Sequence, residues 1–248
     1  MKKILLLIPH PDDEVVGASA IVQRKKKQGC SFFFLFLTNG VLKKKEMWPW
    51  NRKNYENILN IRINEMKRSL NLFDVNEFFL QNISTRQLKY FIRPTIKIIA
   101  KIVLKHKIDS IFTPAYEGGH QDHDVTNCIA SKFKAKLNIF EYSEYNNYQN
   151  KINSNTFIKT TGGEVCYRLS KSEVEFKKKA LKIYDSEKGN LSYLNLRKEC
   201  YRPLINYDYN SPPHEGVLFY RRFSFFSWHP RVDSSHPSEI CKILNEVY

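Results

Sequence analysis

Cysteines are few in this sequence, and their spacing suggests neither a disulfide framework nor a cysteine-rich metal site. The number is odd, no two form a Cys-x-x-Cys pair, and they are widely spaced: Cys30, Cys128, Cys166, Cys200 and Cys241. Small secreted domains stabilised by disulfides carry a dense and even set. The cysteine pattern therefore predicts a protein of a reducing compartment without a disulfide framework.

Long apolar runs are also missing. No stretch approaches the roughly 18 uninterrupted apolar residues of a membrane span. Lys2, Lys3 and the apolar residues 4–8 resemble the start of a secretory signal. That run is shorter than the apolar core of a signal peptide, which has about 7–15 residues. We therefore expect a cytoplasmic protein, with association to a membrane surface left open.

Acidic residues are scarce relative to basic ones. The 248 residues include 25 Asp and Glu against 40 Lys and Arg, a formal charge of +15. Such a surface suits a nucleic-acid binder, a binder of anionic membranes or an enzyme with an acidic substrate. Because the chain is rich in Lys, Asn and Ile, compositional drift would explain the excess equally well. Charge alone does not choose among these classes.

Apolar and amphipathic segments alternate along the first 142 residues. Buried strands are predicted at residues 4–8, 30–37, 75–80, 108–113 and 137–142. Helices are predicted between them, at residues 14–28, 54–70, 85–106 and 122–134. This alternation is typical of an α/β domain with a mostly parallel sheet.

The pattern after residue 145 is less regular. It predicts one or two strands within residues 155–169, an amphipathic helix at 171–184 and a strand at 216–223. The chain shows no internal repeat and no low-complexity linker. We therefore expect a single domain over residues 1–248, with an α/β core in 1–145 and a C-terminal part in 146–248.

Three acids and a histidine follow the first predicted strand, in the segment Pro9-His10-Pro11-Asp12-Asp13-Glu14. Binding sites of parallel α/β sheets lie beyond the carboxyl ends of the strands. Carboxylates this close together repel one another unless a cation holds them. Helix capping by Asp12 or a helix-dipole role for Glu14 would explain single members of this group, but not all four residues.

A second polar cluster follows the strand predicted at 108–113 and reads Gly118-Gly119-His120-Gln121-Asp122-His123-Asp124. Its two histidines are three residues apart, so they share one side of a helical turn. The glycines allow the backbone to approach a ligand closely. Three His and Asp ligands that leave a fourth position for water are typical of catalytic zinc. Two such clusters at strand ends of one sheet therefore predict a catalytic metal site.

Together, the two motifs resemble those of the PIG-L/LmbE-type zinc de-N-acetylases. The segment Arg62-Ile63-Asn64-Glu65 resembles the RxxE helix of this family, and Pro9 stands where the family more often has Ala. The resemblance covers the chain to about residue 145 and implies a Rossmann-like three-layer sandwich around a mostly parallel sheet.

The resemblance also implies roles for the motif residues. It gives the zinc ligands as His10, Asp13 and His123. Asp12 would be the general base that activates a water molecule. His120 would stabilise the oxyanion or protonate the leaving amine, and Asp122 would orient His120. Spacing alone does not distinguish Asp12 from Asp13.

Four residues are expected to contact the substrate: Arg62, Glu14, Tyr116 and His214. Arg62 comes from the resemblance, and the others come from their places near the motifs or in the C-terminal part. Three aromatic residues after the second strand could stack on a sugar or simply pack the loop: Trp48, Trp50 and Tyr55.

The two motifs predict a catalytic metal site, and the resemblance implies a zinc-dependent hydrolase that removes acetyl from an N-acetylated amino sugar. The expected substrate is a small N-acetylglucosamine-type conjugate, such as a sugar nucleotide or a glycolipid precursor, and the basic surface would steer an anionic one to the site. One alternative is a metal-dependent phosphoesterase, which would hold two metals about 3.5–4 Å apart. The other is a basic nucleic-acid-binding protein without catalysis, for which the sequence offers no recognised motif.

Overall fold

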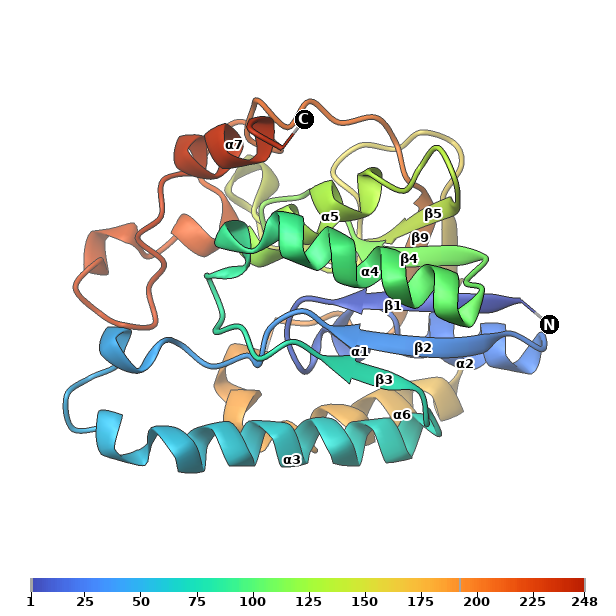
Figure 1. Ribbon diagram of the computed structural model, residues 1–248, viewed down its shortest axis with the longest axis horizontal. Helices are drawn as coiled ribbons and strands as arrows, with labels where there is room; N and C mark the ends of the chain where they lie inside the picture. The colour runs from blue at the N-terminus through green and yellow to red at the C-terminus, as the bar shows by residue number, and fades with distance from the viewer. Residues whose placement is uncertain (1, 192, 248) are drawn as a thin grey trace.

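A seven-stranded sheet runs through the molecule (Figure 1). The computed structural model describes residues 2–191 and 193–247. The strand order is β3-β2-β1-β4-β5-β9-β8. The parallel strands are β1 (Lys3–Ile8), β2 (Ser31–Phe36), β3 (Phe78–Leu80), β4 (Ser110–Pro114) and β5 (Asn138–Tyr142). Two antiparallel strands, β9 (Lys198–Pro203) and β8 (Val165–Arg168), extend the sheet beyond β5.

Helices cover both faces of the sheet, because its central strands are apolar on both sides. Leu5 and Leu7 of β1 pack in one core with α4 (Ile92–His106), α5 (Gln121–Ser131) and α7 (Pro237–Asn245). Leu6 packs in the other core with α2 (Ser19–Lys27), α3 (Tyr55–Phe73) and α6 (Lys171–Leu181). Full burial of such a side chain contributes about 1.5–3 kcal/mol. The predicted three-layer α/β sandwich with a mostly parallel sheet is thereby confirmed.

The helix predicted at residues 14–28 is broken into α1 (Asp13–Val16) and α2. At Gly17, between them, a Cβ would lie 2.4 Å from the Tyr142 ring and 2.7 Å from Glu144. The absent side chain therefore lets the first motif lie directly against the end of β5. None of the helices in the described residues is both long and apolar enough to cross a bilayer.

The C-terminal part departs most from the prediction. Residues 216–223 form no strand; they contain a 3₁₀ turn, Phe219–Arg221, because the chain here packs against the second motif. The Phe219 amide donates to the Gly118 carbonyl at 2.9 Å. Strand β9 and helix α7 were not predicted. A two-stranded ribbon, β6 (Tyr145–Asn146) and β7 (Asn153–Ser154), follows β5.

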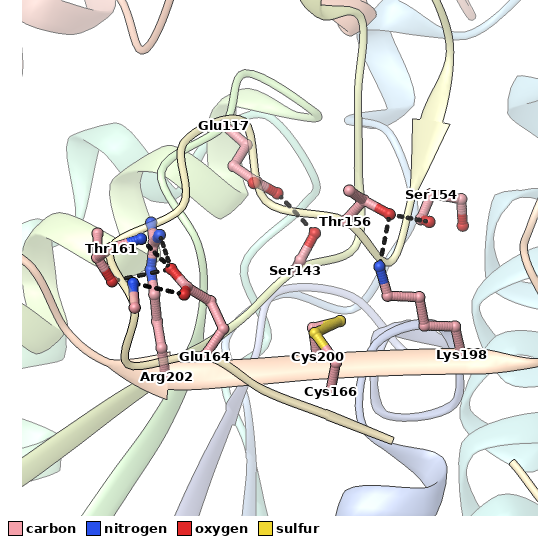
Figure 2. Close-up of a disulfide and its surroundings, with 11 residues drawn as sticks. Glu117, Ser143, Ser154, Thr156, Thr161, Glu164, Cys166, Lys198, Cys200 and Arg202 are labelled. Atoms are coloured by element: carbon pink, nitrogen blue, oxygen red, sulfur yellow. Dashed lines mark hydrogen bonds and ion pairs between the residues drawn. A yellow bond between two sulfur atoms is a disulfide. The ribbon is translucent and has the colours of Figure 1, made fainter. Parts of the chain in front are cut away.

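One disulfide exists where the cysteine spacing predicted none. Cys166 on β8 and Cys200 on β9 are directly paired in the antiparallel register, with Cα atoms 4.2 Å apart (Figure 2). Their sequence separation of 34 conceals this pairing, because the pairing depends on the register of two strands that the sequence pattern barely marks. The expectation was wrong for this pair, while Cys30, Cys128 and Cys241 are free.

Candidate metal centre and active site

The two motifs meet at one edge of the sheet. Strand β1 pairs with β4, and β4 pairs with β5, so the segments after these three strands are neighbours. The strand order reverses direction between β1 and β4, which is where open α/β sheets form their binding crevice. A cavity of about 560 Å³ opens here, and both motifs contribute to its lining.

Three ligand-type atoms converge beside this cavity, and two of the residues that carry them, His10 and Asp13, line it. His10 Nδ1 lies 3.0 Å from Asp13 Oδ2 and 3.3 Å from His123 Nε2. The distance between Asp13 Oδ2 and His123 Nε2 is 3.2 Å. Ligands about 2.0–2.1 Å from a tetrahedral zinc ion lie roughly 3.3 Å from each other. The spacing and the donor types of these buried residues therefore fit zinc.

Each histidine of this trio has a carboxylate at its other ring nitrogen. His10 Nε2 lies 3.0 Å from Asp122 Oδ2, and His123 Nδ1 lies 2.9 Å from Glu144 Oε2. Such outer carboxylates fix the orientation and tautomer of metal-ligating histidines. Glu144 lies two residues beyond β5; its place after the strand predicted at 137–142 puts it near the site, but a single acid after a strand carries no motif that would assign it this role.

The charges at this centre also suit a cation. Burial alone would lower the pKa of His10, but Asp13 and Asp122 outweigh burial and raise this pKa to about 9. Burial would raise the pKa of Asp13, yet His123 and His10 hold it well below its ordinary value. The acids are therefore ionised while the imidazoles attract protons. A metal ion would replace those protons on binding.

His120 lies at the cavity edge and caps α5. Its Nδ1 accepts a hydrogen bond from the Asp122 amide at 3.1 Å, so a neutral ring carries its proton on Nε2. Burial and the charge of His10 lower the pKa of His120 well below its ordinary value. The Asp122 carboxylate is 3.7 Å from His120 Nδ1 and closer, at 3.0 Å, to His10. Asp122 thus contacts the His10 ring more directly than the ring it was expected to orient.

Asp12 lines the cavity from a strained backbone position, with a φ of 131°. Its carboxylate accepts a 2.8 Å hydrogen bond from Arg62, which also lines the cavity. Burial raises the pKa of Asp12 well above its ordinary value, and Arg62 opposes this effect. The buried Glu14 carboxylate accepts hydrogen bonds from the Asp12 amide at 3.0 Å and from the hydroxyls of Ser69 and Tyr184 at 2.5 Å each. Glu14 therefore supports the strained turn.

The four expected substrate contacts separate into two groups. Arg62 lies in the cavity, whereas Glu14, Tyr116 and His214 do not belong to its described lining. The Tyr116 hydroxyl donates to the Ser211 carbonyl at 2.8 Å, inside the core. The ring of His214 packs against Tyr148, with centroids 5.7 Å apart.

Aromatic and basic side chains form part of the cavity wall that the motifs do not supply, beside aliphatic and polar ones. Trp48 lies in the loop whose aromatic residues were predicted either to stack on a sugar or to pack the loop. Several of the others come from β6 and the C-terminal part and were not predicted, among them Tyr145, Tyr193, Phe219, Arg222 and Phe223. The segment 219–223 was interpreted as a strand, which hid its place at the cavity.

Comparison with known proteins adds independent observations. Residues 5–134 match the family model of PIG-L, described as GlcNAc-PI de-N-acetylase. No curated protein matches the chain by sequence.

Among solved structures, a deacetylase–bog complex from the biosynthesis pathway of teicoplanin aligns with a TM-score of 0.65 and 14% identity, covering 84% of this chain and 99% of that chain. N,N'-diacetylchitobiose deacetylase from Pyrococcus horikoshii aligns with a TM-score of 0.53 and 20% identity, covering 82% and 83%. GalB, the 4-carboxy-2-hydroxymuconate hydratase from Pseudomonas putida KT2440, aligns with a TM-score of 0.58 and 12% identity, covering 84% and 98%. A hydratase and deacetylases thus share this fold, so the chemistry must be argued from the site residues.

Proposed function

The chain belongs to the PIG-L family of GlcNAc-PI de-N-acetylases and is a deacetylase, and from this premise we propose that it uses zinc to remove acetyl from an N-acetylated amino sugar. The observation that carries the proposal is the convergence of His10 Nδ1, Asp13 Oδ2 and His123 Nε2 within 3.3 Å of one another. The proposed substrate is an N-acetylglucosamine-type conjugate. The family description and the names of the teicoplanin and diacetylchitobiose deacetylases support this class.

In this proposal His10, Asp13 and His123 hold the zinc ion, and Asp122 and Glu144 hold the two imidazoles in place. A zinc ion bound there supplies Lewis-acid chemistry, which polarises a carbonyl and lowers the pKa of water toward about 7. The rest of the reaction needs a base for the attacking water and a donor for the developing charge.

Asp12 is the proposed general base. It lines the cavity next to Asp13, and Arg62 holds its carboxylate in one orientation. A buried carboxylate with a raised pKa accepts a proton more readily than an exposed one. Arg62 would also contact the substrate, as its place in the lining allows.

His120 is the proposed hydrogen-bond and proton donor. With Nδ1 occupied by the Asp122 amide, its Nε2–H is free to donate to the oxyanion or to carry a proton to the leaving amine. Its ring lies edge-on to His10, with centroids 4.5 Å apart, so donor and metal ligands are adjacent.

The cavity wall supports a sugar conjugate that carries negative charge. Aromatic faces such as those of Trp48 and Tyr193 can stack on a sugar ring, and two arginines of the wall, Arg222 and Arg231, can pair with phosphate. The proposal predicts that kcat/KM falls as salt rises, because screening weakens the attraction.

We also propose that the whole chain acts as one domain. Strands β8 and β9 complete the same sheet, and α7 packs in the same core as α4 and α5. The cavity wall draws residues from both the α/β core and the C-terminal part.

The test is acetate release by the zinc-loaded protein from a panel of N-acetylglucosamine conjugates: a nucleotide, a lipid-linked phosphate and a simple glycoside. We expect release from at least one of them. Release from none, with zinc present, would contradict the substrate class. Release of phosphate rather than acetate would favour the phosphoesterase alternative.

A further inference from the structure

An exposed group of aromatic side chains borders the mouth of the cavity. We call it the aromatic rim, formed by Trp48, Trp50, Phe223, Phe225, Phe226 and Trp228. The indoles of Trp48 and Trp50 stack with centroids 4.8 Å apart, and Trp48 and Trp228 lie 6.1 Å apart. The loop before α3 and the segment before α7 thus meet, at the left of Figure 1. The two segments are far apart in the sequence.

Most of the rim is open to water. The exposed fraction is 90% for Phe225, 68% for Trp228 and 65% for Trp50. Single exposed apolar residues are common, but a contiguous exposed apolar patch on a monomer marks an interaction site. Neither Phe225 nor Phe226 belongs to the described lining of the cavity, so substrate binding does not explain them.

The charge around the rim identifies the kind of partner. Residues 43–53 contain five Lys and Arg and one acid, Glu46, and residues 217–231 contain three Arg and no acid. Aromatic side chains settle at the headgroup level of a bilayer, and nearby Lys and Arg are attracted to anionic lipids. The rim combines both features on one surface.

We propose that the aromatic rim is a docking face for an anionic lipid bilayer. An isologous contact between two copies would bring the same cations together, which disfavours a second copy as the partner. Trp48 and Phe223 belong to both the rim and the cavity wall. Docking would therefore place the cavity mouth at the lipid headgroups. Membrane docking is a property beyond the proposed function, and it can be measured without catalysis.

The natural fluorescence of the protein offers a direct test. The chain has three tryptophans, Trp48, Trp50 and Trp228, and all of them belong to the rim. Their emission should shift to the blue when the protein meets vesicles of phosphatidylcholine mixed with phosphatidylglycerol. Brominated acyl chains should quench it. The shift should weaken with salt and be much smaller with phosphatidylcholine alone, because the cations need an anionic surface.

The double variant Phe225→Ser/Phe226→Ser keeps every tryptophan and should bind these vesicles at least about tenfold more weakly, a loss of roughly 1.4 kcal/mol. The matched control is Leu104→Ser on α4, which removes a side chain that is 78% exposed and outside the rim. This control should bind as the wild type does.

Three results would overturn the proposal. The first is a folded wild-type protein that gives no shift and does not sediment with anionic vesicles. The second is equal binding by the wild type and the double variant. The third is a different partner: a lipid-free dimer that the double variant dissociates, or tighter binding to a single-stranded oligonucleotide than to the vesicles.

Discussion

The chain before residue 146 and the chain after it build one sheet in different ways. The first region makes parallel strands joined by helices, and the proposed metal ligands and general base follow two of those strands. The second region adds two antiparallel strands, a disulfide and much of the cavity wall. In this account, the first region supplies the chemistry, while the second supplies support and recognition.

The support is visible in buried contacts between the two regions. Glu199 of β9 accepts hydrogen bonds from the amides of Ala20 and Ile21 at the start of α2, at 2.7 and 3.1 Å. Lys177 of α6 pairs with Glu199 at 2.8 Å and donates to the Val16 carbonyl at 2.8 Å. The second region therefore holds the helices that follow the first motif, although it contributes no proposed metal ligand.

The largest effect is expected within the first region, where Asp12→Asn removes the proposed base. Acetate release should fall by about 10²–10⁴-fold, the usual contribution of general acid–base catalysis. Bound zinc should remain, because Asp12 is not one of the three converging ligands. Asp13→Asn is the matched variant and should lose both zinc and activity. Equal zinc loss in the two variants would remove the distinction between base and ligand.

The next largest effect concerns stability and tests how the second region supports the helices of the first. Lys177→Met leaves the buried Glu199 charge without its cation and should lower the free energy of unfolding by about 3–5 kcal/mol, measured in urea. Lys178→Met, on the same helix, breaks only an exposed pair with Glu175. This variant should change the free energy of unfolding by at most about 1 kcal/mol. Similar losses in both variants would refute the supporting role of the buried pair.

The disulfide belongs to the second region and should matter for stability alone. Cys166→Ser should lower the free energy of unfolding by about 2–4 kcal/mol, because it releases a constraint on the unfolded chain. Zinc stoichiometry should not change. Cys30→Ser, at a free cysteine, is the control and should have little effect on stability. Loss of zinc from Cys166→Ser would show that the metal site of the first region depends on the disulfide of the second.

The smallest effect lies at the junction, where Glu144 follows the last parallel strand. Glu144→Gln should weaken zinc binding about 10–100-fold, as expected for an outer partner of a metal-ligating histidine. Glu117→Gln is the matched control, since Glu117 is also buried but contacts Ser143 and the Ile158 amide. Titration with a competing chelator measures both affinities, and equal values for the two variants would contradict the role of Glu144.

Sequence patterns predicted the features that depend on neighbouring residues. They missed the features that depend on contacts between residues far apart in the chain. The apolar run before Pro9 and the polar cluster after it lie within a few residues, so a strand and a site at its end could both be predicted. Glu144 joins the site only because β5 ends beside β4. Cys166 meets Cys200 only through the register of β8 and β9, and Trp228 reaches Trp48 only because the C-terminal part folds back over the cavity.

The zinc content of the purified protein, measured after loading and gel filtration, shows whether His10, Asp13 and His123 form a metal centre. We expect stoichiometric zinc in the wild type and nearly none in His123→Ala, with the variant still folded by circular dichroism. A wild type without stoichiometric zinc, or a His123→Ala variant that retains it, would contradict a metal centre formed by His10, Asp13 and His123.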